Sequence, residues 1–99
     1  MSKRVQKDQW VWVVVQDPGG NEQLLGQYNE DSEESFLPVF LEKEEAQQGL
    51  TLLTRDPTLG YEVQAIQYED LAQRATENGF LLFILDGSGA LLEKVAPQG

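Results

Sequence analysis

Three segments of this chain are apolar on both sides of an extended backbone, and they limit the possible folds more than any other feature. They are Trp10 to Val15, Phe36 to Leu41 and Phe80 to Leu85. Alternate residues of a strand point to opposite faces of a sheet, so each run predicts a strand that is covered on both faces. A β-sheet is therefore expected at the centre of the fold.

The segments between these runs predict two helices and further strands. Residues 42 to 53 have helical apolar spacing, with acids in the first turn, and residues 69 to 78 repeat this pattern before a left-handed stop at Gly79. Gly49 lies inside the first helix, so either its backbone packs closely on the sheet or the helix is loose there. More polar strands are expected at residues 23 to 28, 61 to 67 and 90 to 95.

Together these elements predict a single α+β domain over residues 1–99. It has a mixed β-sheet of about five or six strands with two helices, in the order β-β-β-α-β-α-β-β. Residues 1–8 and 96–99 are expected to fray. Ninety-nine residues are enough for a hydrophobic core without disulfides.

Pro38 divides the second apolar run. Phe36, Pro38 and Phe40 lie on one face of that strand, and Leu37, Val39 and Leu41 lie on the other. Proline cannot donate a hydrogen bond to a neighbouring strand. The strand is therefore expected at a sheet edge or at a bulge.

The composition removes several classes of function. The chain contains no cysteine and no histidine, which excludes disulfides, thiolate nucleophiles and the usual imidazole bases and metal ligands. Its net charge of −10 argues against a surface that binds nucleic acid. The short apolar run after the basic N-terminus is neither a signal peptide nor a membrane span, so a cytoplasmic protein is expected.

No motif predicts a catalytic, cofactor or metal site. The Gly87 to Gly89 segment resembles a dinucleotide loop but lacks the following glycine and helix, and a hairpin turn is expected instead. The acids of residues 30 to 34 lack the spacing of a calcium loop. The serines have no base to activate them, so we expect no enzyme.

The amount of apolar strand surface leads to the functional hypothesis. If both helices cover the same face of the sheet, the other face stays open, and a second copy or another protein would cover it. If the strand order reverses, one helix covers each face and the chain can be a monomer. We favour the first arrangement, with a candidate interface formed by Trp10, Trp12, Phe36, Pro38 and Phe40.

One segment resembles a known family. The run Phe36-Leu37-Pro38-Val39-Phe40, followed by Glu44-Glu45-Ala46, is similar to the opening of the SseB (enhanced serine sensitivity) N-terminal domains, where such a strand leads into an acidic helix. In those domains a serine or threonine usually caps the helix, whereas this chain has Leu41-Glu42. The resemblance implies a small α+β domain without an established catalytic site.

The sequence therefore predicts a small soluble protein-interaction domain with a regulatory or accessory role. Its expected partner is another protein or a second copy, with no nucleic acid, membrane or cofactor. The alternatives are a domain that binds a small apolar ligand between sheet and helices and, less favoured, a carboxylate-dependent enzyme.

Overall fold

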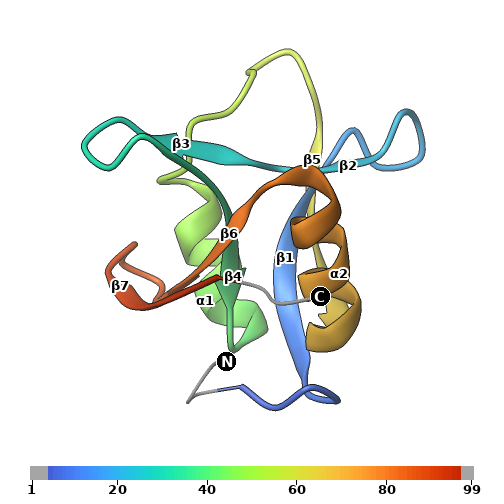
Figure 1. Ribbon diagram of the computed structural model, residues 1–99. Helices are drawn as coiled ribbons and strands as arrows, with labels where there is room; N and C mark the ends of the chain where they lie inside the picture. The colour runs from blue at the N-terminus through green and yellow to red at the C-terminus, as the bar shows by residue number, and fades with distance from the viewer. Residues whose placement is uncertain (1–4, 97–99) are drawn as a thin grey trace.

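A computed structural model describes residues 5–96, which form one mixed sheet with two helices (Figure 1). The strands are β1 (Trp10–Gln16), β2 (Gln23–Leu24), β3 (Gln27–Asn29), β4 (Glu34–Phe40), β5 (Tyr61–Gln67), β6 (Leu81–Leu85) and β7 (Leu91–Val95). The helices are α1 (Lys43–Leu50) and α2 (Tyr68–Asn78). The predicted α+β class and element order are confirmed, with seven strands instead of five or six.

The additional strand arises because residues 23 to 28, predicted as one strand, form two strands with different partners. β2 pairs with β1, whereas β3 pairs with β4. At the change the Leu25 amide donates to the Val14 carbonyl oxygen at 2.9 Å. A Cβ on Gly26 would lie 2.9 Å from the Phe80 ring, so this glycine lets the chain cross closely over that side chain.

β5 and β7 lie at opposite edges of the sheet, with β1, β4 and β6 between them. β1 is antiparallel to both β4 and β5, and β4 is parallel to β6. The connection through α1 therefore steps from β4 outward over β1 to β5, and the connection through α2 steps back to β6. Two right-handed crossovers in opposite directions place their helices on opposite faces.

The apolar side chains accordingly form two clusters, one on each face. The α2 face includes Val11, Val39, Leu71 and Ile84, and the α1 face includes Val14, Phe40, Ala46 and Phe83. The favoured arrangement, with both helices on one face and the other face open, is wrong. The alternative with one helix on each face is the one the structure shows.

Pro38 lies in an inner strand, because β4 pairs with β6 from Phe36 to Phe40. On its other side, β4 pairs with β3 at residues 34 to 36 and with β1 only at Phe40. The proline falls between these two short ladders, where no strand pairs with it on that side. The expected edge strand is therefore wrong, and a gap in the ladder accommodates the missing donor.

α1 is shorter than expected and packs tightly on the sheet through Gly49. A Cβ at this position would overlap the Phe40 ring. The close-packing interpretation of Gly49 is thus confirmed. The first turn carries Glu44 and Glu45, which favour the positive end of the helix dipole.

Both ends of α2 are satisfied by the backbone. Gly79 ends the helix with φ 74°, and the Phe80 amide donates to the Ala75 carbonyl at 2.9 Å, so the predicted left-handed stop is confirmed. At the start, the amides of Tyr68 and Glu69 donate to the carbonyls of Gln9 and Lys7 at 2.8 and 2.9 Å.

The segment from residue 5 to residue 9 is therefore held in place. Val5 is also buried in the cluster on the α2 face. The fraying expected for residues 1–8 and 96–99 stays a prediction, and positions 1–4 and 97–99 lie outside the described residues.

Candidate functional site: the free edge of β5

β5 presents the longest unpaired edge of the sheet. All seven of its residues pair with β1, from Tyr61 opposite Gln16 to Gln67 opposite Trp10. Across residues 5–96 no strand pairs with its other side. A free edge of this kind exposes backbone donors and acceptors that an additional strand can use.

The backbone hydrogen bonds at the two ends of β5 show which of its N–H and C=O groups point away from β1. The Asp17 amide donates to the Gly60 carbonyl, and the Tyr68 amide donates to the Gln9 carbonyl, both at 2.8 Å. Residues 60 and 68 therefore direct their polar groups toward β1. The N–H and C=O groups of successive residues in a strand point to opposite sides. In β5 those of the even-numbered residues therefore point toward β1, and those of the odd-numbered residues point outward. The outward-facing residues are Tyr61, Val63, Ala65 and Gln67.

The other free strand edges are less suited to accept a strand. β7 has five residues, its pairing with β6 shifts register beside Leu85, and it carries Lys94. A bulge and an edge lysine are devices that discourage strand addition. β2 and β3 have two and three residues. β5 is longer, its pairing with β1 runs through seven residues without a register shift, and its one charged residue is Glu62.

Two tryptophans lie beside this edge on the α1 face. Trp12 is opposite Ala65 and Trp10 is opposite Gln67. Trp12 is half-buried, with the Lys43 ammonium 5.7 Å from its ring centroid, a cation–π distance. Trp10 is 59% exposed, and Ala65 is also exposed. The small alanine leaves room above the edge for a side chain of an added strand.

The five residues of the expected interface do not share one surface. Pro38 and Phe40 are fully buried within this chain, which leaves them no area for a partner to cover. Phe36 is half-buried and stacks on Phe83, with ring centroids 4.0 Å apart. These three residues belong to the core on the α1 face because α1 covers that face. Only Trp10 and Trp12 remain beside a free edge.

A shallow hollow flanks β5 on the α2 face. Its volume is about 340 Å³, and it is lined by Ile66, Asp70, Gln73, Arg74 and Glu77. The four helix residues form one stripe of α2, because their spacing follows the helical repeat. The lining is mainly polar, unlike the apolar cavity expected for a small apolar ligand.

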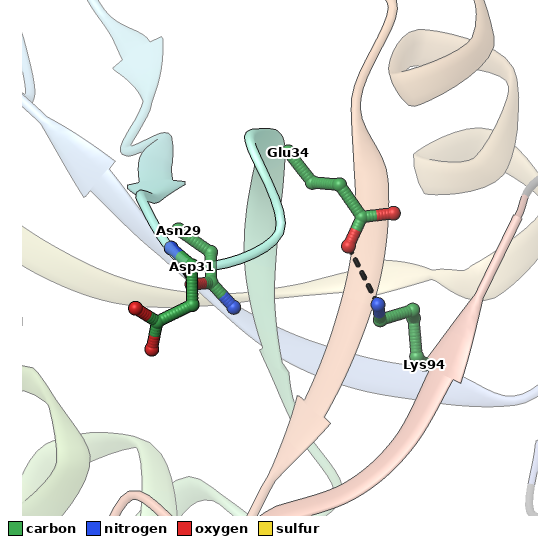
Figure 2. A network of polar contacts seen from close by, with 4 residues as sticks. All are labelled: Asn29, Asp31, Glu34 and Lys94. Atoms are coloured by element: carbon green, nitrogen blue, oxygen red, sulfur yellow. Dashed lines mark hydrogen bonds and ion pairs between the residues drawn. The ribbon is translucent and has the colours of Figure 1, made fainter.

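The acidic loop between β3 and β4 holds its carboxylates apart. The Glu34 carboxylate bonds to the Lys94 ammonium at 2.5 Å, whereas the Asp31 side chain points away from this pair (Figure 2). The Asp31 amide donates to Asn29 Oδ1 at 3.1 Å, which shapes the turn. The hydrogen bond from Lys94, followed by one from Ser32, lowers the pKa of Glu34. Within residues 5–96, no three acidic side chains gather as metal ligands.

The Gly87 to Gly89 segment forms the turn of the β6–β7 hairpin, as the sequence predicts. Asp86 Oδ1 accepts hydrogen bonds from the Ser88 hydroxyl at 2.7 Å, the Ser88 amide at 2.9 Å and the Ala90 amide at 3.0 Å. These donors, chiefly the Ser88 hydroxyl, hold the pKa of Asp86 below its ordinary value. The carboxylate therefore has a structural role in the turn.

Replacing Ser88 by alanine is expected to raise the pKa of Asp86, because the hydroxyl bond favours the charged carboxylate. The folded-state pKa of Asp86 is lowered, so its contribution to stability is present above the unfolded pKa and is lost as pH falls through the folded value. A carbon-13 NMR titration of the Asp86 carboxyl measures this midpoint. Ser35→Ala is the control and should leave it unchanged. A wild-type midpoint at or above the ordinary value of 3.8 would contradict the assignment.

Comparison with known proteins adds no assignment. The chain matches no protein-family model, no curated protein and no solved structure. The resemblance of residues 36 to 46 to the SseB N-terminal domains therefore stays a prediction. No helix within the described part of the chain is long and apolar enough to cross a membrane.

Proposed function

We propose that this protein is an interaction domain that receives an extended segment of a partner protein along the free edge of β5. The observation that carries the proposal is the row of outward-facing backbone groups at Tyr61, Val63, Ala65 and Gln67. In strand addition, such groups supply affinity through main-chain hydrogen bonds. Side chains that alternate between the two faces supply specificity.

The surroundings of β5 offer a different environment on each face. On the α1 face a side chain of the added strand would lie next to Ala65. Because Ala65 is small, that side chain could also make apolar contact with Trp12, which lies opposite Ala65 in β1. On the α2 face the neighbouring side chain would enter the hollow beside Ile66, whose rim is charged. We expect a bound segment to alternate apolar and polar residues accordingly.

A proline substitution tests this mode of binding. Ala65→Pro removes an outward-facing donor and places a ring on the edge, while the bonds from the even-numbered residues to β1 remain. Short peptides selected from a random displayed library on the wild-type protein are the probe, and fluorescence anisotropy measures their affinity. We expect Ala65→Pro to weaken binding about tenfold or more, which corresponds to about 1.4 kcal/mol.

The matched control is Ala65→Ser, which keeps the amide donor and the small side chain and should bind like the wild type. Circular dichroism of both variants checks that the fold is retained. Selected peptides that bind Ala65→Pro with undiminished affinity would overturn the proposal. So would chemical-shift changes that centre on another part of the molecule.

A further inference from the structure

We infer that the strand added to β5 is the β5 strand of a second copy, antiparallel to the first and related to it by a two-fold axis at Gln64. This inference rests on the proposed function and names its partner. It differs from the open-face interface expected from the sequence, because here the sheets join edge to edge and both apolar faces stay covered by their own helices.

The backbone favours this register over its neighbours. Hydrogen bonding across the new edge requires odd-numbered residues of one copy to face odd-numbered residues of the other. An axis at Gln64 places Tyr61 opposite Gln67 and Val63 opposite Ala65, so every outward-facing residue is paired. An axis at Val63 or Ala65 leaves at least one outward-facing residue of each strand beyond the end of its partner. The two-fold axis at Gln64 therefore gives the longest ladder.

The side chains are compatible with this register on the α1 face. Val63 of one copy would lie opposite Ala65 of the other, and Ala65 itself lies opposite Trp12 in the sheet. Val63 is half-buried and Ala65 is exposed, so the pairing covers a small exposed side chain with a β-branched one. Cross-strand pairs of this type contribute to sheet stability.

On the α2 face the register keeps the two Glu62 carboxylates apart and brings each one to a hollow that holds both acidic and basic side chains. Glu62 of one copy would lie opposite Ile66 of the other and would enter the hollow that Arg74 lines. The guanidinium of Arg74 can donate hydrogen bonds to this carboxylate and form an ion pair with it. Asp70 and Glu77 also line the hollow, so the carboxylate must reach Arg74 between them. An axis at Glu62 would instead place two carboxylates directly opposite each other.

The net charge of −10 on each copy opposes association. Salt screens this repulsion, since the Debye length falls from about 30 Å at 0.01 M to about 8 Å at 0.15 M. We therefore expect dimers to form more readily at the higher ionic strength. Ala65→Pro should remain monomeric, and Ala65→Ser should dimerise like the wild type. Sedimentation velocity over a range of protein concentrations measures these masses.

Cysteine cross-linking tests the register itself, because the chain contains no cysteine of its own. In an antiparallel ladder the residues at a non-hydrogen-bonded pair have Cα atoms about 4.5 Å apart, within the range of a disulfide. Gln64→Cys should thus give a disulfide-linked dimer under mild oxidation. Glu62→Cys alone should form no disulfide-linked dimer, because the two cysteines would lie about 14 Å apart along the strands.

A mixture of Glu62→Cys and Ile66→Cys should cross-link, since these positions oppose each other across the axis. A wild-type protein that stays monomeric at high concentration and a Gln64→Cys variant that does not cross-link would overturn the inference. A dimer that persists in Ala65→Pro would also overturn it. These results would overturn the dimer but not the proposed function, provided that selected peptides bind the wild type and lose affinity in Ala65→Pro. Peptides that bind without dependence on Ala65 would overturn the proposed function as well.

Discussion

Phe40→Ala is expected to lower the free energy of unfolding by about 3–5 kcal/mol, the usual cost of truncating a buried phenylalanine. Phe40 is 0% exposed and belongs to the cluster between α1 and the sheet. Its removal leaves a cavity that the strands cannot close, because Phe40 is paired with both Trp12 and Leu85. Urea denaturation followed by tryptophan fluorescence measures the loss.

Leu52→Ala is the matched control, since Leu52 is 60% exposed. This exposed change should shift the free energy of unfolding by no more than about 0.5 kcal/mol. Equal effects of the two substitutions would contradict the placement of Phe40 in the core.

Gly49→Ala is expected to destabilise the protein although alanine is the better helix former. The helix-propensity gain is about 1 kcal/mol. Overpacking against the buried Phe40 ring typically costs about 1–3 kcal/mol, and this ring cannot move aside because it is enclosed. The steric cost should therefore exceed the gain, and thermal unfolding should shift to lower temperature.

Gln47→Ala is the comparison for this experiment. Gln47 is exposed on the same helix, so the substitution should be neutral or slightly stabilising. A Gly49→Ala protein with a higher melting temperature than the wild type would show that α1 does not approach Phe40 as closely as described.

The strands could be predicted because their patterns are local. β1, β4 and β6 are apolar on both faces, and β5 matches its expected range from Tyr61 to Gln67. The division of β4 into two faces was also correct, with Leu37 and Val39 toward α2 and Phe40 toward α1. Such alternation follows directly from strand geometry.

The arrangement of these strands could not be predicted in the same way. Right-handed crossovers permit both helices on one face or one on each face, and the outcome depends on the spatial order of strands. Nothing in residues 61 to 67 indicates an edge, because a half-buried alternating pattern occurs at edges and inside sheets alike. Pro38 predicted a sheet edge for β4, and this prediction was wrong. The sequence does not show that β3 and β1 share one side of this strand, with the proline between them.

The hydrogen bonds that join the first turn of α2 to the carbonyls of Lys7 and Gln9 have a consequence for the order of folding. The amides of Tyr68 and Glu69 find their acceptors in a part of the chain made about sixty residues earlier. Contacts between segments so far apart in sequence must close a long loop, which slows their formation. The first turn of α2 should therefore become ordered only after the N-terminal segment has packed against it. The last turn, which Gly79 caps, can form from residues that are close in sequence.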